Sequence, residues 1–343
     1  MKDSKKVLLT GVTGFLGSHT AIQLLEKGYH VLGTMRDLSR SESIKAVIAE
    51  HTDKTDKLSF AQADLSDDTV WEDLVKGMDY IQHIASPFPR VLPKKEEDLI
   101  VPAKQGTLRI MAAAAANQVK RVVLTSSTGS IIYGKDKDQR NRTFTEEDWT
   151  DVTNKKDSTP YFRSKTIAEQ AAWDFIEKDQ SGLELATVCP GAILGPVLEN
   201  DFGTSANLIV KTIDGSAPAI PKIGFDTVDV RSVADLLIRA MESPKAANQR
   251  YIGSAGYLKF MDVANILRKA YPDRKIPKAY LPNFAVKLYA NIDPSLKPVL
   301  LDLGTERRLD NGKAKRELGW QPIDNEEAVL SCAKSILALG ILK

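Results

Sequence analysis

The sequence predicts an α/β protein built on a doubly wound parallel sheet, with a smaller mixed lobe beside it. Three observations favour this fold. Short apolar runs alternate with helical segments up to Pro190, a glycine-rich loop joins the first run to the first helix, and the helical signal weakens after Pro190. Apolar runs separated by helices are typical of strands that are buried on both faces of a parallel sheet. Right-handed crossovers then place helices on both faces of that sheet.

The first half of the chain supplies the alternation, and each apolar run is short enough to be a strand of a buried sheet. The predicted strands cover residues 7–9, 29–35, 58–63, 80–85, 121–125 and 185–189. The predicted helices cover residues 18–26, 44–50, 70–76, 108–117 and 161–177.

The second half leaves the sheet twice. Residues 191–225 are rich in glycine and proline and have a weak helical signal, and residues 228–230 and 233–241 then read as a strand and a helix. A last strand is predicted at 251–253, followed by helices and proline-rich connections. We therefore expect a larger domain of residues 1–190 plus 225–255, and a smaller lobe of residues 191–224 plus 256–343. The C-terminal helix can pack on either part.

Composition excludes several classes of protein. A net charge of +2 over 343 residues gives no electrostatic basis for binding nucleic acid or an anionic membrane. Two cysteines, Cys189 and Cys332, are too few for a disulfide framework and have no spacing typical of a metal site. The lysines before residues 7–9 precede too short an apolar run for a signal peptide. We expect a cytoplasmic protein without bound metal, either a monomer or a homodimer.

The loop after the first strand predicts a dinucleotide site. Gly11, Gly14 and Gly17 stand between a buried strand and an amphipathic helix, which is the context that such a motif requires. Glycines there allow a tight turn and a close approach of backbone to pyrophosphate, which meets the helix N-terminus. The alternative is a plain tight turn. The expected cofactor contacts in this loop are Gly11, Thr13, Gly14, Phe15, Leu16 and Gly17.

The end of the second strand bears on the choice of cofactor. Enzymes that prefer NAD place a carboxylate here for the ribose 2′-hydroxyl, but this chain has Met35 followed by Arg36, with Arg40 four residues on. A guanidinium suits a 2′-phosphate. Asp37 leaves an alternative, in which Arg36 lies on the surface and pairs with the carboxylate of Asp37. We favour NADP(H) over NAD(H).

Two further motifs carry hydroxyl groups and a lysine. Tyr161 and Lys165 are four residues apart and share one helix face, so the ammonium favours the phenolate. Lowering a tyrosine pKa from ~10 to ~7 takes about 4 kcal/mol, which a lysine and a positive nicotinamide ring could supply. Ser126 and Ser127 follow a strand at the sheet edge where ligands bind. Each motif alone often occurs by chance, and only the two motifs together with the glycine loop indicate an active site.

This set resembles the extended branch of the short-chain dehydrogenase/reductase superfamily, over nearly the whole chain. The spacing Gly-x-x-Gly-x-x-Gly, the serine and the Tyr-x-x-x-Lys motif carry the resemblance. So do the runs 83–87 (His-Ile-Ala-Ser-Pro), 168–173 (Ala-Glu-Gln-Ala-Ala-Trp) and 318–320 (Leu-Gly-Trp). Within the branch, the chain is most similar to the dihydroflavonol reductase, cinnamoyl-CoA reductase and fungal aldehyde (methylglyoxal) reductase group. That group uses NADPH and has an arginine where Arg36 stands.

The resemblance implies a division of roles. Ser127 would position a substrate carbonyl, Tyr161 would protonate the developing alkoxide, and Lys165 would bind the nicotinamide ribose and tune Tyr161. Hydride would pass from the nicotinamide to the carbonyl carbon. Residues 1–190 plus 225–255 would be the NADP-binding Rossmann domain, and the lobe would bind the substrate. Further cofactor contacts implied by the resemblance are Asp64, Leu65, Ala85, Ser86, Thr125, Pro190 and Gly191.

One departure from the group concerns the substrate. Flavonoid reductases grip their substrate with an Asn or Asp five residues past the catalytic serine, where this chain has Ile132 followed by Tyr133. A plant polyphenol is therefore disfavoured, and a smaller or more apolar carbonyl is expected. Phe88, Ile132 and Tyr133 are the expected substrate contacts.

Two other functions compete with an aldehyde or ketone reductase. The first is a nucleotide-sugar epimerase or dehydratase on the same fold. Sugar dehydratases usually have Thr-Asp-Glu near the serine, where this chain has Ser127-Thr128-Gly129, and the tightly held NAD of epimerases fits poorly with Met35 and Arg36. The second is a non-catalytic NADP-sensing regulator. Such proteins typically lose the tyrosine or the lysine, and both are present here.

Overall fold

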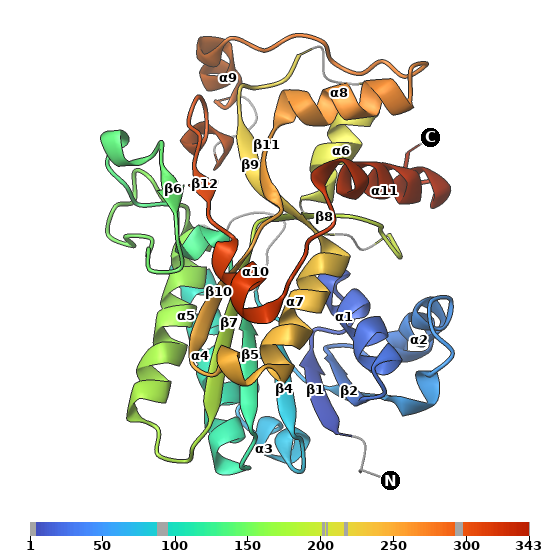
Figure 1. Cartoon of the computed structure of the whole chain (residues 1–343), viewed down its shortest axis with the longest axis vertical. Helices are drawn as coiled ribbons and strands as arrows, with labels where there is room; N and C mark the ends of the chain where they lie inside the picture. Colours follow the sequence, from blue (N-terminus) through green and yellow to red (C-terminus); the bar gives the residue numbers. More distant parts are fainter. Residues whose placement is uncertain are drawn as a thin grey trace.

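A seven-stranded parallel sheet forms the centre of the molecule, in the order β3-β2-β1-β4-β5-β7-β10 (Figure 1). The computed structural model describes residues 5–87, 95–200, 203, 205–215, 219–291 and 298–342. The strands are β1 (Lys6–Thr10), β2 (His30–Met35), β3 (Leu58–Gln62), β4 (Tyr80–His83), β5 (Arg121–Thr125), β7 (Glu184–Pro190) and β10 (Gln249–Gly253). The strand order reverses between β1 and β4, and ligands of such sheets bind outside the carboxyl ends of the strands at this point. The predicted doubly wound fold is confirmed.

Helices cover both faces of the sheet because successive strand residues point to opposite sides. Val7 and Leu9 of β1 pack with α1, α2 and α7, whereas Leu8 between them packs with α3, α4 and α5. All three side chains are fully buried. The helices are α1 (Phe15–Glu26), α2 (Ser41–Ala49) and α7 (Val230–Glu242) on one face, and α3 (Trp71–Val75), α4 (Glu97–Ala116) and α5 (Pro160–Lys178) on the other.

The smaller lobe is built on a separate sheet of order β11-β9-β8, above the central sheet in Figure 1. Its core joins side chains from this sheet and from three helices. The C-terminal helix α11 contributes Ala328, Val329 and Cys332 to that core, so it packs in the lobe. The elements are β8 (Ala192–Leu194), β9 (Gly224–Asp229), β11 (Gly256–Lys259), α6 (Ala206–Ile213), α8 (Phe260–Ala270) and α11 (Asn325–Ala338).

The lobe corrects two expectations. The strand expected at 228–230 is the end of β9, which pairs with β8 and β11, so the chain re-enters the central sheet with α7 and β10 rather than near residue 225. The glycine- and proline-rich stretch also contains α6, whose apolar face packs on α8 and α11. Both elements are fixed by contacts with distant segments.

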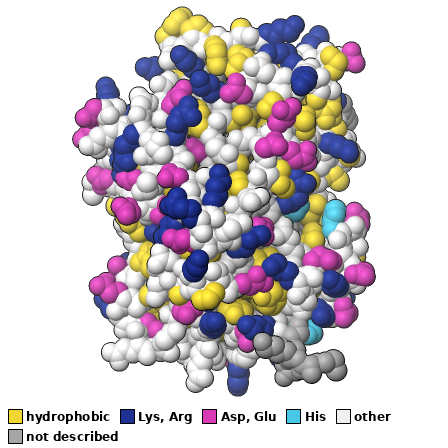
Figure 2. All heavy atoms as spheres, viewed as in Figure 1, with side chains coloured by type: hydrophobic (Ala, Val, Ile, Leu, Met, Phe, Trp, Pro, Cys, Tyr) yellow, Lys and Arg dark blue, Asp and Glu magenta, His cyan; other side chains and the backbone are white. Residues whose placement is uncertain are grey.

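A short pair of strands, β6 (Thr143–Phe144) and β12 (Arg308–Leu309), joins a segment of the large domain to one of the lobe. Two further helices are α9 (Asn283–Tyr289) and α10 (Gly312–Leu318). Acidic and basic side chains are intermixed over the face shown in Figure 2. Within the described ranges, no helix combines the length and apolarity that crossing a bilayer requires.

Candidate active site

The glycine loop connects β1 to α1 at the point where the strand order reverses. Gly11 has a φ of +74°, and a Cβ there would come within 3.1 Å of the Ala85 Cα at the end of β4. A Cβ on Gly17 would lie 2.0 Å from the Gly11 carbonyl oxygen. Only glycine fits Gly17, and at Gly11 a side chain would be strained. The loop therefore turns tightly and leads into the N-terminus of α1.

The first turn of α1 suits an anion. Its N-cap, Gly14, is extended and has no side chain to occupy the helix end, and no acidic residue stands in the first turn. Backbone N–H groups and the positive end of the helix dipole favour a pyrophosphate at such a position. Thr13, Phe15 and Leu16 follow the same path, so the predicted loop contacts lie together.

The threonine before the loop was missed by the sequence reasoning. The Thr10 hydroxyl oxygen accepts hydrogen bonds from the backbone nitrogens of Ile84 (3.1 Å) and Ala85 (3.0 Å) and lies 2.9 Å from His83 Nδ1. Since both lone pairs are used, the hydroxyl donates to His83 Nδ1. Burial, followed by the charge of Lys165, lowers the pKa of His83 to about 3. His83 is therefore neutral, and Thr10 ties the segment with Ala85 and Ser86 to the loop.

Two arginines, Arg36 and Arg40, follow β2, the strand next to β1 in the central sheet. Arg36 follows β2 and is exposed. Arg40 ends the short 3-10 helix η1 (Leu38–Arg40), and its Nη2 lies 2.9 Å from both carboxylate oxygens of Glu199. Asp37 caps η1 by accepting a hydrogen bond from the Ser39 backbone nitrogen. Glu199 lies 159 residues away in sequence, so no local pattern could have predicted its pairing with Arg40.

Asp64 lies at the end of the β3 segment, beside Arg36. Hydrogen bonds from the side chain and backbone of Ser66 lower the pKa of Asp64, and the charge of Arg36 adds to this. Asp64 is therefore ionised at neutral pH. The predicted contact at Leu65 lies against Gly106 of α4, where a Cβ would come within 2.9 Å of the Leu65 Cβ.

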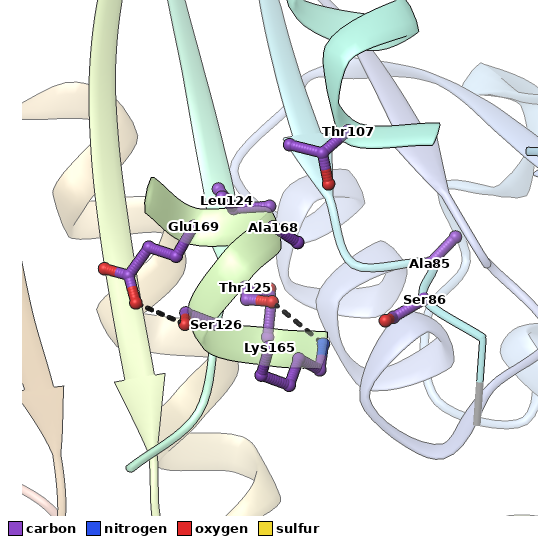
Figure 3. A pocket seen from close by; sticks show the side chains of 9 residues that line it. All are labelled: Ala85, Ser86, Thr107, Leu124, Thr125, Ser126, Lys165, Ala168 and Glu169. Carbon is purple, nitrogen blue, oxygen red and sulfur yellow. Dashed lines mark hydrogen bonds between the residues drawn. The ribbon is translucent and has the colours of Figure 1, made fainter. Parts of the chain in front are cut away.

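Ser127, Tyr161 and Lys165 come together beside the end of β5. Ser127 caps the 3-10 helix η3 (Thr128–Ser130), and its Oγ accepts a hydrogen bond from the Gly129 backbone nitrogen at 3.0 Å. Thr159 caps α5 and Pro160 occupies its first turn, which places Tyr161 at the start of the helix and Lys165 one turn on. Tyr161 forms a side-chain hydrogen bond with Ser127. Lys165 Nζ donates to the Thr125 carbonyl oxygen at 3.3 Å (Figure 3).

Burial controls the titration of the pair. It raises the pKa of Tyr161 to about 12, and the hydrogen bond with Ser127 opposes this shift. Burial also lowers the pKa of Lys165 to about 8, against the charge of Glu169. The sequence argument expected the lysine to bring the tyrosine pKa down, but in the protein alone the direction is upward because desolvation dominates. The phenol is therefore protonated at neutral pH and can act as a proton donor.

A cavity of about 10 Å³ lies between β5, α4 and α5 (Figure 3). Its lining includes Ser86, Thr107, Thr125 and Lys165. The Thr125 hydroxyl oxygen is buried and has no hydrogen-bond partner within the described residues. A space of this size holds about one water molecule or one ligand hydroxyl group. Together with the glycine loop at the same edge of the sheet, these polar groups fit a bound dinucleotide.

Pro190 and Gly191 turn the chain from the central sheet into the lobe. Pro190 ends β7, and the Gly191 nitrogen donates to the Gly253 carbonyl oxygen at 3.0 Å. A Cβ on Gly191 would lie 2.3 Å from the Asp226 carbonyl oxygen of β9. Glycine is therefore required where β7 passes close to the smaller sheet.

The structure describes two of the three predicted substrate contacts. Phe88 lies outside the described residues. Ile132 is buried, and the Tyr133 ring stacks on the Phe162 ring with centroids 3.9 Å apart. The Tyr133 hydroxyl donates to Asp302 at 3.0 Å, so its polar group is already used in the core. Ile132 and Tyr133 therefore pack beside the site. Their contacts do not by themselves support direct contact with a substrate.

The comparisons with known proteins agree with this geometry. The family model described as NAD dependent epimerase/dehydratase family matches residues 7–253. The chain belongs to this family. The family contains the extended short-chain dehydrogenase/reductases, so the predicted family resemblance is confirmed.

Several relatives of comparable length are described as reductases. The chain is 32% identical to the ketoreductase azaE of Aspergillus niger, over 97% of this chain and 98% of that protein. It is 30% identical to the cinnamoyl-CoA reductase CAD2 of Medicago truncatula, over 90% and 96%. The solved structure of yeast methylglyoxal/isovaleraldehyde reductase Gre2 complexed with NADPH matches with a TM-score of 0.78 and 28% identity, covering 97% of this chain and 98% of that one.

Proposed function

We propose that the protein reduces an aldehyde or ketone to an alcohol with NADPH. The observation that carries this proposal is the hydrogen-bonded pair of Ser127 and Tyr161, with Lys165 one helical turn away, at the sheet edge that also presents the glycine loop. Gly11, Gly14 and Gly17 would hold the pyrophosphate, and Arg36 and Arg40 the 2′-phosphate. The NADPH bound to the yeast reductase of similar fold supports this cofactor.

The roles of the residues follow from their protonation states. When bound, NADPH supplies the hydride. Ser127 donates a hydrogen bond to the substrate carbonyl oxygen, and Tyr161 transfers its proton to that oxygen as negative charge develops. Lys165, charged below a pKa of about 8, stabilises the phenolate that Tyr161 becomes. Tyr161 is half-buried, so the transfer takes place partly shielded from water.

We propose a small or apolar carbonyl as the substrate. Ile132 stands where flavonoid reductases carry a polar grip, and its side chain is buried in an apolar cluster with Ile131 and Tyr133. The lobe built on β8, β9 and β11 would supply the remaining substrate contacts.

A substrate panel tests the proposal. Purified protein is mixed with NADPH or NADH and a series of aldehydes, ketones, diketones and keto esters, and loss of the reduced nicotinamide is followed by absorbance. We expect oxidation of NADPH with short or apolar carbonyls, and slower reaction with NADH. No oxidation with any carbonyl, together with epimerisation of a nucleotide sugar, would overturn the reductase assignment.

A further inference from the structure

Glu169 lies beneath the active site and was not assigned a role by the sequence. It is on α5, one turn beyond Lys165, and only 1% of its side chain is exposed. Its Oε2 accepts hydrogen bonds from Ser126 Oγ at 2.5 Å and from Ser130 Oγ at 2.7 Å (Figure 3 shows the first). These two serines bracket Ser127, so one carboxylate oxygen holds both ends of the turn that carries the serine hydroxyl.

The second carboxylate oxygen of Glu169, Oε1, also accepts hydrogen bonds. Arg250 Nε, from the edge strand β10, donates to Oε1 at 2.7 Å, and the Thr187 hydroxyl of β7 donates to the same oxygen at 2.9 Å. The Arg250 guanidinium also stacks on the Trp149 ring at 3.7 Å. A buried carboxylate that is both paired and hydrogen-bonded stays ionised, and burial of such a charge without these partners would be strongly unfavourable.

The charge of Glu169 also reaches Lys165. Burial lowers the pKa of Lys165, and the negative charge of Glu169 is the largest effect that opposes it. Among the described residues, the other titratable groups near the ammonium are Tyr161 on the same helix, Cys189 of β7 and neutral His83 of β4. Burial raises the pKa of both Tyr161 and Cys189 to about 12. Arg250 faces Glu169 from the side of β10. Glu169 is therefore the nearby charge best placed to keep Lys165 protonated.

We propose that Glu169 is a positioning residue of the active site, which fixes the Ser127 turn through Ser126 and Ser130 and maintains the positive charge of Lys165. The catalytic part of this proposal rests on the proposed reductase function. The electrostatic part concerns the ligand-free protein and can be tested without turnover.

The first test measures Lys165 directly. Protein labelled with ¹³C at the lysine Cε is titrated by NMR, and the Lys165 signal is assigned by its loss in Lys165→Arg. We expect the midpoint of Lys165 to fall by about one pH unit in Glu169→Gln, because an opposite charge nearby shifts a pKa by 1–3 units. Glu169→Asp, which keeps the charge, should retain the midpoint near that of the wild type.

The second test uses the pH dependence of kcat. Turnover needs charged Lys165, so it falls as pH rises through the pKa of that residue, and this alkaline fall should begin at lower pH in Glu169→Gln. Ser126→Ala and Ser130→Ala should lower kcat several-fold without changing KM for NADPH or the alkaline fall. A purely structural role would instead lower kcat equally at every pH.

A double variant allows the test to be made even if Glu169→Gln alone does not fold. Glu169→Gln leaves Arg250 buried without its carboxylate, so the double variant Glu169→Gln/Arg250→Gln restores a neutral pair if the single variant does not fold. An unchanged Lys165 midpoint in Glu169→Gln would overturn the proposal, as would an equal shift in Glu169→Asp. Because the double variant also loses the positive charge of Arg250, it is compared with Arg250→Gln, and equal Lys165 midpoints in these two variants would overturn the proposal as well. A wild type that reduces no carbonyl, but whose Lys165 midpoint depends on Glu169, would refute the reductase function and leave the electrostatic inference standing.

Discussion

The proposed catalytic residues form the catalytic end of the site, and two ion pairs form its borders with the smaller lobe. The catalytic end and the borders are built in different ways. Ser127 lies in the turn between β5 and η3, and Tyr161 and Lys165 lie on α5, all within one domain. The borders are made by side chains from distant segments: Arg40 with Glu199 at one end, and Asp157 with Arg307 at the other. The catalytic end is therefore assembled within the large domain, from α5 and the turn after β5, whereas the borders depend on how the lobe packs against that domain.

The first prediction addresses the catalytic end. Tyr161→Phe removes the proposed proton donor and the hydrogen bond with Ser127, and should lower kcat by about 10²–10⁴-fold, the usual contribution of a general acid. NADPH affinity, measured by fluorescence titration, should stay within about twofold of the wild type because the ring and helix remain. Turnover at the wild-type rate would contradict the role given to Tyr161.

The second prediction addresses the border at Arg307. This side chain is 3% exposed, and its two Nη atoms bind both carboxylate oxygens of Asp157 at 2.6 and 3.1 Å. Arg307→Met leaves Asp157 and Asp302 buried with less compensation, and should lower the free energy of unfolding by about 3 kcal/mol. Urea denaturation measures the change.

The neighbouring residue provides a matched control for that experiment. Arg308 pairs with Glu306 at the surface, where their side chains are 52% and 43% exposed. Arg308→Met should cost less than about 1 kcal/mol. If the two variants lose equal stability, the buried pair does not join the lobe to the domain as the contacts indicate.

The smallest effect is expected at the other border. If Arg40 binds the 2′-phosphate, Glu199 competes for the same guanidinium. Arg40→Ala should then raise KM for NADPH about fivefold, and Glu199→Gln should lower it by about twofold, since a partly exposed pair contributes ~0.2–1 kcal/mol. KM for NADH serves as the internal control and should not change in either variant. Parallel changes for both cofactors would show that these residues do not select the 2′-phosphate.

The difference between local and distant contacts also determines which features the sequence can predict. The central sheet, the tight turn at Gly11 and the shared helix face of Tyr161 and Lys165 depend on neighbours in the chain, and periodicity or spacing is sufficient to find them. The pairing of β9 with β8 and β11 could not be predicted, because any buried strand reads alike until its partners are known.

Hydrogen bonds between side chains that are distant in sequence could not be predicted either. Tyr133 reads as an aromatic residue near the catalytic serine, and only the fold reveals that its hydroxyl is bound by Asp302, 169 residues away. The rise in the Tyr161 pKa was missed for a related reason. The Tyr-x-x-x-Lys spacing shows a favourable charge but not the desolvation that outweighs it in the protein alone.

The place of Arg250 in the chain has a consequence for biosynthesis. Glu169 is made 81 residues before the arginine that neutralises it, and that arginine lies on β10, the edge strand of the central sheet. On the ribosome, every strand from β1 to β7 can emerge while the carboxylate under Ser127 still lacks its counter-charge. Until β10 docks, this carboxylate either stays hydrated or takes up a proton, so the full set of contacts under Ser127 forms only after residue 250 has been made.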